Sequence, residues 1–115
     1  MIELKNEKLT VFINETGAEL TSVKNRDGRE YIWCGDPAIW SGHCPVLFPV
    51  CGRLRNGQYT YEGRTYSMKN HGFARRKTFE AKKLSDTEAI FSLREDEETL
   101  AEYPFRFLFV VRFLL

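Results

Sequence analysis

The sequence predicts an all-β protein, an antiparallel β-sandwich, and three observations support this fold class. Most segments are short runs rich in β-branched and aromatic residues, which is typical of strands. Turn signals rich in Gly, Asn and Asp separate these runs, so consecutive strands are expected to pair as antiparallel hairpins. One short stretch, residues 96–103, has the pattern of a helix. With 115 residues, 43% of them hydrophobic, the chain has enough apolar material for the core of one domain.

The first part of the chain predicts strands separated by tight turns. Met1–Lys5 has the pattern of a strand start, and Lys8–Asn14 (KLTVFIN) is rich in β-branched and aromatic residues. Ala18–Asn25 alternates only loosely, which favours an edge or partly buried strand. The turn Arg26–Arg29 then leads to Glu30–Trp33, which we expect to return as a short strand and complete a first hairpin.

The middle of the chain predicts a loop followed by a hairpin. Residues 34–45 contain Gly-Asp-Pro and Ser-Gly breaks, so we expect an ordered loop that is pinned by the bulk of Ile39 and Trp40. Residues 59–66 read Tyr-Thr-Tyr, a Glu-Gly turn, then Arg-Thr-Tyr. This is the clearest hairpin signal in the sequence.

The last part predicts a strand pair, a short helix and a final strand. Thr78–Leu84 and Glu88–Arg94 flank a Ser-Asp-Thr turn. Asp96–Tyr103 is acidic in its first turn, which suits a helix N-terminus; its apolar contact is expected to be Leu100, and Pro104 ends it.

Residues 105–115 (FRFLFVVRFLL) form a nearly continuous apolar strand, as expected for a strand covered on both faces. No turn residue or polar terminus follows it. We therefore expect residues 1–115 to be a single N-terminal part of a larger β-sandwich domain that is incomplete at its C-terminus. An unpaired apolar edge of this kind would favour a homodimer.

The charge, hydropathy and cysteine content of the sequence limit the partners and the location that we expect. Lys plus Arg is 17 and Asp plus Glu is 16, so the net charge of +1 gives no reason to expect a nucleic-acid partner or a membrane surface. The longest apolar run, residues 107–111, is too short to span a bilayer, and no apolar leader opens the sequence. The three cysteines, an odd number without framework spacing, predict reduced thiols and a cytoplasmic location.

Arg53 is the first candidate for a ligand contact. It follows a buried run and Gly52, so its planar five-donor group is free to project into a cavity, where sugar hydroxyls or a carboxylate would accept its hydrogen bonds. The alternative is structural: either Arg53 or Arg55 forms an ion pair and the other is solvated.

His71 is the second candidate, because imidazole can donate or accept a hydrogen bond to a sugar or transfer a proton. The alternative is a histidine that closes a loop by bonding a backbone carbonyl. His43, in the loop, is a weaker candidate. The set His43, Cys44, Cys51 and His71 lacks the spacing of a zinc site, so no metal site is predicted.

Two further side chains are candidates for substrate contacts. Arg75 opens a short basic cluster that could recognise a phosphate, although adjacent charges at a strand entrance are more often solvated. Phe73, like Trp33 and Trp40, could stack against a sugar face, with core packing as the alternative for at least two of the three rings.

Three motifs in this order resemble the aldose 1-epimerase, or galactose mutarotase-like, family. They are Pro45–Leu54 (PVLFPVCGRL), the Tyr-x-Tyr-x-Gly-x-x-Tyr hairpin and Asn70–Arg75 (NHGFAR). The resemblance extends from about Leu9 to Tyr103. It implies a large antiparallel supersandwich that binds a hexose in a cleft and interconverts its α and β anomers without a cofactor.

The resemblance also implies roles for two residues. Arg53 and His71 match the family's sugar-binding arginine and first histidine, which hold the ring-oxygen side and the hydroxyls of the sugar. The family's general acid, a second histidine, and its general base, a glutamate, would lie beyond Leu115. We therefore expect no catalytic residue within this segment, and no activity from the segment alone.

Three other functions remain open at this point. One is a non-catalytic carbohydrate-binding β-sandwich, and another is a purely structural interaction domain. The third is a hexose-6-phosphate 1-epimerase, which uses a similar HGFAR element in which Arg75 would face the phosphate; the Pro-Val-Leu-Phe-Pro run favours the free-sugar branch.

Overall fold

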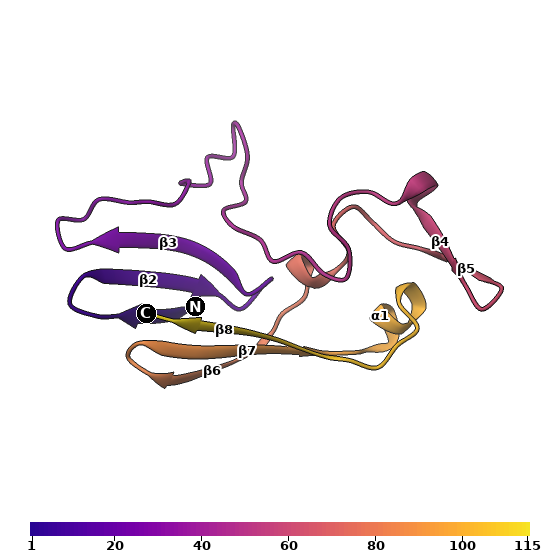
Figure 1. Ribbon diagram of the computed structural model, residues 1–115. Coiled ribbons are helices and arrows are strands. Elements are labelled where there is room, and N and C mark those ends of the chain that lie inside the picture. The colour runs from indigo at the N-terminus through magenta and orange to yellow at the C-terminus, as the bar shows by residue number, and fades with distance from the viewer.

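A computed structural model describes all of residues 1–115. Its strands pair antiparallel in two three-stranded sheets and one separate hairpin. The two larger sheets lie one above the other, as the layers of a sandwich do (Figure 1). The predicted all-β, antiparallel class is therefore confirmed. No helix has the length and apolar character needed to cross a membrane.

The first sheet is formed by the N-terminal strands, in the order β1-β2-β3. These are β1 (Ile2–Lys5), β2 (Leu9–Asn14) and β3 (Glu19–Asn25). β3 is an edge strand of this sheet, as its loose alternation predicts. The second sheet has the order β6-β7-β8 and is formed by β6 (Glu80–Ser85), β7 (Glu88–Arg94) and β8 (Leu108–Leu114).

The core lies between the two sheets and under the connection between them. In β2 and β7, the central strand of each sheet, every second side chain is buried, which is the period expected when one face of a strand is covered. The buried apolar residues are Leu4, Val11, Ile13, Ala18, Met68, Phe73, Ala74, Phe79, Ala89, Phe91 and Leu93. Three of them, Met68, Phe73 and Ala74, belong to the segment that carries the candidate site.

The expected strand at Glu30–Trp33 is not formed, so this prediction was wrong. A single bridge joins Glu30 to Lys24, and the chain then leaves the sheet. The Glu30 carboxylate accepts the Val23 N–H, which a ladder would pair with the Tyr31 carbonyl, whereas the Tyr31 N–H still donates to the Val23 carbonyl at 2.9 Å. The donors to this carboxylate are the N–H groups of Val23, Tyr31 and Ile32, at 2.7, 3.0 and 3.1 Å, and the hydroxyl of Ser22.

These hydrogen bonds give the first stability prediction. Burial alone would raise the pKa of Glu30, but the bonds from Ser22 and three main-chain N–H groups outweigh it and lower the pKa from 4.5 to about 2. The folded-state pKa is lowered, so the bonded carboxylate stabilises the fold above pH 4.5, and this contribution is lost as the pH falls toward 2. Glu30→Ala should lower the free energy of unfolding at pH 7 by about 2 kcal/mol.

Urea unfolding between pH 2 and pH 7 tests this expectation. Exposed Glu3 on β1 forms no hydrogen bond through its side chain, so Glu3→Ala is the matched control, with an expected change within about 0.5 kcal/mol. The difference between the two variants should shrink as the pH falls below 4.5. Equal losses in both variants, or a difference independent of pH, would contradict the role given to Glu30.

The short helix α1 (Glu97–Glu102) lies where the acidic first turn predicts it. Asp96 caps it: the Asp96 carboxylate accepts a hydrogen bond from the Thr99 N–H at 2.8 Å, and the Thr99 hydroxyl accepts one from the Asp96 N–H at 2.9 Å. Thr99 is buried, whereas Leu100 is exposed. The expected apolar contact through Leu100 was therefore wrong, because the capping interaction turns Thr99 toward the core instead.

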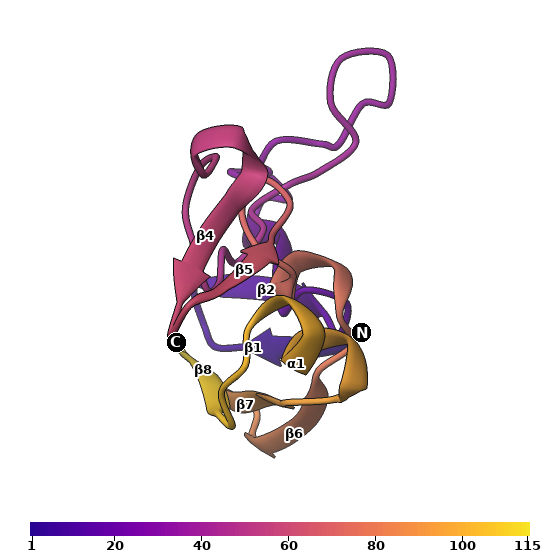
Figure 2. The same cartoon turned by 90° about the vertical axis from the view of Figure 1, so that its right-hand side faces the viewer.

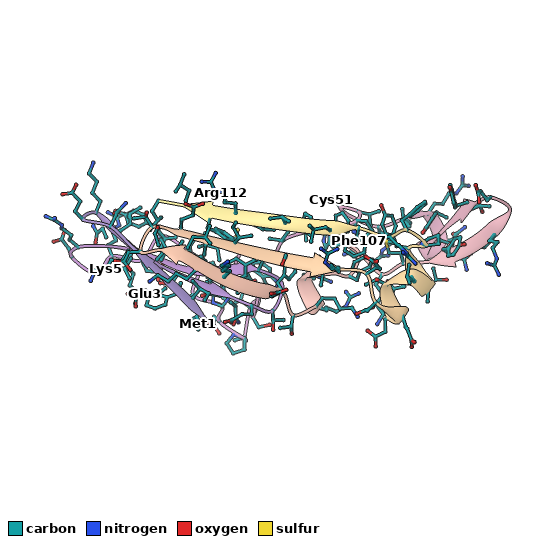
Figure 3. All side chains as sticks on the ribbon, turned by 90° about the horizontal axis from the view of Figure 1, so that it is seen from below. Met1, Glu3, Lys5, Cys51, Phe107 and Arg112 are labelled. Atoms are coloured by element: carbon teal, nitrogen blue, oxygen red, sulfur yellow. The ribbon has the colours of Figure 1, made fainter.

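Within residues 1–115 the last strand is covered on one face, and the predicted cover of its second face stays a prediction. β8 pairs with β7 alone and begins at Leu108, three residues later than predicted. Its apolar residues alternate between the core side and the outer face, where Leu108, Val110 and Leu114 are exposed. Figure 3 shows this sheet from below, with Arg112 on β8. The outer face of β8 is therefore apolar as well as its core side.

The remaining chain between β3 and β6 forms a long loop and the predicted hairpin. Strands β4 (Gln58–Tyr61) and β5 (Arg64–Ser67) project beyond the two sheets, and the loop that follows β3 extends separately (Figures 1 and 2). The loop is closed by the Trp33 indole N–H, which donates to the Trp40 carbonyl at 2.8 Å. Ile39 and Trp40 themselves are exposed rather than pinning the loop through burial.

Candidate functional site

Two loop segments far apart in the sequence lie against each other and form the candidate site. Phe48 and Gly72 form a parallel bridge, and the Phe48 carbonyl accepts hydrogen bonds from the main-chain N–H groups of Phe73 and Ala74 at 3.0 and 3.2 Å. The hairpin β4–β5 lies between these segments in the chain. It therefore folds the PVLFPVCGRL and NHGFAR motifs back onto each other, as the sequence predicts.

Gly52 and His71 are paired by two hydrogen bonds. The His71 main-chain N–H donates to the Gly52 carbonyl at 2.8 Å, and the Gly52 N–H donates to Nδ1 of the His71 imidazole, also at 2.8 Å. The second bond fixes the direction of the ring. The structural alternative, an imidazole that bonds a backbone carbonyl, is not found, because the ring accepts its bond from a backbone N–H instead.

The turn at residues 71–72 requires glycine at its second position. His71 and Gly72 both have positive φ, 65° and 70°. A Cβ on Gly72 would lie 2.5 Å from the Phe48 carbonyl carbon and closer still to its oxygen. The two segments can approach this closely only because residue 72 has no side chain.

Arg53 is exposed and directly follows Gly52, so its main chain lies beside His71. Its guanidinium forms no hydrogen bond or ion pair within the chain, and neither does that of Arg55 in the 3-10 turn Arg55–Gly57. The structural alternative, in which one of the two arginines forms an ion pair, is not found. A substrate contact by Arg53 stays a prediction that this free side chain permits.

Arg75 and Phe73 lie on the same segment as His71, in different surroundings. Arg75 is half-buried, and its guanidinium donates a long, 3.5 Å hydrogen bond to the Asn70 carbonyl. Phe73 is 3% exposed, with its ring 5.9 Å from that of Phe48 and 5.8 Å from that of Phe107. Phe73 therefore packs in the core, and a sugar contact by this ring stays a prediction.

The weaker candidates lie in the exposed loop. The His43 imidazole packs against Gly35, where it leaves no space for a Cβ, and the His43 N–H donates to the Glu19 carboxylate at 2.8 Å. Trp33 and Trp40 are both about half exposed, so neither ring packs in the core. The expectation that at least two of Phe73, Trp33 and Trp40 are core residues holds for Phe73 alone.

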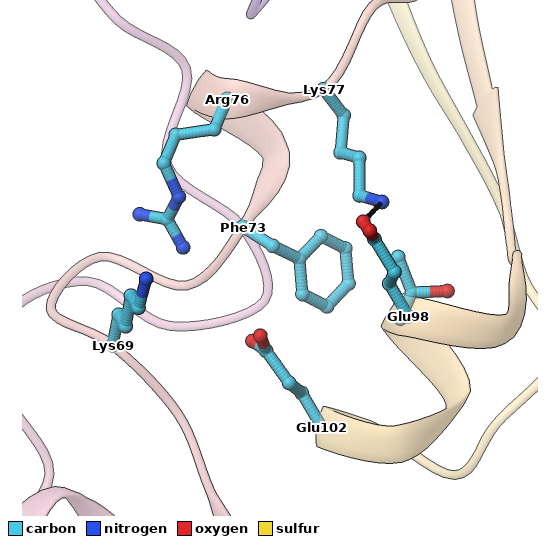
Figure 4. A pocket seen from close by; sticks show the side chains of 7 residues that line it. Lys69, Phe73, Arg76, Lys77, Glu98 and Glu102 are labelled. Carbon is cyan, nitrogen blue, oxygen red and sulfur yellow. Dashed lines mark hydrogen bonds and ion pairs between the residues drawn. The ribbon is translucent and has the colours of Figure 1, made fainter.

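A charged cavity of about 290 Å³ opens beside Phe73, between residues 69–77 (the site segment) and α1 (Figure 4). It is lined by Lys69, Phe73, Arg76, Lys77, Glu98, Thr99 and Glu102. Lys69 and Glu102 were not among the predicted residues. The sequence does contain a signal for the acidic wall: Glu98 and Glu102 are four residues apart, and this spacing puts two residues on one face of a helix.

Lys77 ties the site segment to α1. Its ammonium forms ion pairs with Asp96, at 2.8 Å, and with Glu98. Burial alone would lower the pKa of Lys77, but the hydrogen bonds to these two carboxylates outweigh it and raise the pKa above its usual value. The Lys77 hydrogen bond, followed by that from the Thr99 N–H, lowers the pKa of Asp96. This contact anchors the segment that follows His71.

The family model for aldose 1-epimerase matches residues 1–115. Among individual proteins, the chain is 40% identical over 111 residues to the plasmid-encoded Protein LacX of Lactococcus lactis subsp. lactis, and this match covers 92% of the chain and 37% of LacX. The chromosomal Protein LacX of the same organism matches to the same extent.

Solved structures of related proteins have the same fold. The galactose mutarotase related enzyme from Lactobacillus acidophilus is 43% identical with a TM-score of 0.96, over 99% of this chain and 38% of that one. A galactose mutarotase-like protein from Lactobacillus casei ATCC 334 is 40% identical with a TM-score of 0.96, over all of this chain and 40% of that one. The chain thus spans well under half the length of these relatives.

Proposed function

The chain belongs to the aldose 1-epimerase family, and from this premise we propose that it supplies the sugar-binding part of a protein that interconverts the α and β anomers of a hexose. One observation supports this most directly: the paired hydrogen bonds between Gly52 and His71 hold the main chain of Arg53 beside that histidine. An unpaired guanidinium and a half-buried imidazole are suitable partners for the hydroxyl and ring oxygens of a sugar.

The proposed reaction is an acid/base ring opening. A base removes the proton from the anomeric hydroxyl while an acid protonates the ring oxygen, so the bond between C1 and the ring oxygen breaks and an aldehyde forms. Rotation about C1–C2 exposes the other face of the carbonyl. The hydroxyl then adds to that face, and both protons return. Arg53 and His71 would hold the sugar throughout, with Arg75 and Phe73 as further contacts.

We propose that the acid and base of this reaction are a histidine and a glutamate outside residues 1–115. The segment would then bind a hexose without turning it over. We further propose a cytoplasmic location, since Cys34, Cys44 and Cys51 are all exposed and unpaired, as suits a reducing compartment.

A titration of the ¹⁵N-labelled chain with galactose or glucose tests the binding step. Saturable shifts of the backbone NMR signals are expected at Gly52, Arg53 and His71. Arg53→Ala should weaken binding at least about tenfold, the loss expected for one charge-assisted hydrogen bond. Arg55→Ala, the same truncation two residues away in the neighbouring 3-10 turn, is the matched control and should leave binding unchanged. Absence of saturable shifts around these residues would contradict the proposal.

The catalytic step is tested by a chimera in which this chain replaces the matching part of the Lactobacillus acidophilus relative. Polarimetry should show that the chimera accelerates mutarotation of a hexose and that Arg53→Ala reduces this rate. Binding without turnover would favour the non-catalytic sugar-binding alternative. Turnover of glucose 6-phosphate alone would favour the hexose-6-phosphate branch, and a loss of that activity in Arg75→Ala would assign the phosphate contact.

A further inference from the structure

The backbone around His71 is held in an uncommon conformation. His71 has a φ of 65°, in the left-handed region that residues other than glycine seldom adopt. Three main-chain hydrogen bonds maintain it: His71 N–H to the Gly52 carbonyl, Gly72 N–H to the Lys69 carbonyl at 3.0 Å, and Phe73 N–H to the Phe48 carbonyl. Non-glycine residues in such conformations occur preferentially at functional sites, where the surrounding structure fixes them.

The imidazole of His71 has one hydrogen-bond partner in the chain, the main-chain N–H of Gly52. A neutral imidazole carries its single proton on one nitrogen and accepts with the other. Because the Gly52 N–H is a donor that cannot reverse its role, Nδ1 must be the accepting nitrogen. The proton therefore lies on Nε2, because the hydrogen bond made by one ring nitrogen decides which of the two is protonated.

We infer that the Gly52 main-chain N–H is a positioning group that holds His71 as the Nε2–H tautomer, so that this histidine meets a sugar as a hydrogen-bond donor. This inference rests on the proposed sugar-binding function. It assigns His71 an acceptor oxygen of the ligand, either the ring oxygen or a lone pair of a hydroxyl. It also separates His71 from the base that removes the anomeric proton, because Nδ1 is occupied and Nε2 already carries a proton.

The adjacent residue has the same chemical character. Arg53 follows Gly52 directly, and a guanidinium has five donors and no acceptor. Gly52 has a φ of 85°, in the left-handed region that favours glycine, and the space around its Cα is open. Gly52 is thus required for the path of the backbone that directs its N–H at His71. The Arg53 guanidinium and the Nε2–H of His71 are thus both hydrogen-bond donors, and both suit ligand oxygens with free lone pairs.

The tautomer can be measured directly on the whole chain. Long-range ¹H–¹⁵N correlation spectra of the histidine rings, recorded at pH 8, distinguish a protonated from an unprotonated ring nitrogen. His71 is expected to show a protonated Nε2 and an unprotonated Nδ1. The chain contains two histidines, and the His43 ring forms no hydrogen bond in the structure, so His43 provides an internal reference for a mixture of tautomers. A protonated Nδ1 on His71, or the same mixture as His43, would overturn the inference whether or not a hexose binds.

A second measurement tests the donor role. On saturation with hexose, the Nε2 signal of His71 should shift more than its Nδ1 signal. If hexose binds but leaves Nε2 unaffected, the donor role is wrong. If hexose does not bind, the proposed function fails, whereas the tautomer is still decided by the spectrum of the free protein.

Two substitutions separate the two ring nitrogens. The side-chain oxygen of Asn lies close to the position of Nδ1, so His71→Asn retains the bond from Gly52 and lacks the Nε2 donor. The amide of Gln reaches the position of Nε2, so His71→Gln retains a donor there. If the inference is right, His71→Gln binds hexose more tightly than His71→Asn, although His71→Asn is the more stable variant. The reverse order of affinities would overturn it.

Discussion

Gly72→Ala is expected to lower the free energy of unfolding by about 2–5 kcal/mol. Two costs combine. The positive φ of 70° is strained for alanine by about 1–2 kcal/mol, and the new Cβ would lie 2.5 Å from the Phe48 carbonyl carbon and 2.7 Å from Cδ of Pro49. Backbone and a proline ring cannot move aside as a flexible side chain would.

Gly63→Ala is the matched control, because Gly63 has a φ of 76° and open space where its Cβ would lie. It should cost only the backbone strain, about 1–2 kcal/mol. Urea unfolding of both variants measures the difference. In Gly72→Ala the backbone signals of Gly52 and His71 should also shift, because the two loop segments must separate. Equal destabilisation of both variants would show that close packing at Gly72 is unimportant.

Phe48→Ala is expected to cost about 3 kcal/mol, because its ring is the centre of the aromatic cluster that joins the site to the second sheet. The Phe48 ring is stacked on Phe109 of β8, with centroids 4.3 Å apart and an interplanar angle of 12°. It also meets three other rings, those of Phe73, Tyr103 and Phe107, at centroid distances of 5.9, 6.0 and 5.3 Å. Truncation would remove all four contacts and leave a cavity.

The same truncation at Phe12 provides the comparison. Phe12 lies on β2 between two core-facing residues, so it occupies the outer face of the sheet, and no other aromatic ring contacts it. Phe12→Ala should cost about 1 kcal/mol. Thermal or urea unfolding decides between the two values. If both variants lose the same stability, the aromatic cluster does not anchor the site as described.

The elements that the sequence predicts well are those whose signals are local. The hairpin β4–β5 follows from alternating aromatic residues around a Glu-Gly turn, and the pair β6–β7 follows from two strand patterns around Ser-Asp-Thr. In each of them the side-chain period and the turn chemistry indicate the same structure. The antiparallel class follows from these pairs directly.

The failed predictions have a different physical origin: a side chain bonds the main chain and overrides the local pattern. The Glu30 carboxylate accepts the Val23 N–H that a strand at 30–33 would pair with, and the Asp96–Thr99 capping pair turns Thr99 inward in place of Leu100. Such bonds depend on the three-dimensional path of the chain, so hydrophobic periodicity does not predict them.

The candidate site is intermediate between these cases. The nearness of the Arg53 and His71 segments could be predicted, because a hairpin between two motifs returns the chain to its starting point. The bond from Gly52 to Nδ1 could not, since it requires positive φ at Gly52, His71 and Gly72 together. Conformations of this kind are set by tertiary contacts such as that between Phe48 and Gly72.

The part of the chain that carries β4 and β5 begins and ends at the two hydrogen bonds between Gly52 and His71. The length of this part of the chain can therefore change without changing the geometry of the Gly52–His71 pair. Residues inserted at the tip between Tyr61 and Arg64 would raise the entropic cost of closing the loop only slowly, by about 0.6 kcal/mol for each doubling of loop length. The β4–β5 hairpin can therefore change in length and sequence while the backbone spacing between Gly52 and His71 stays the same.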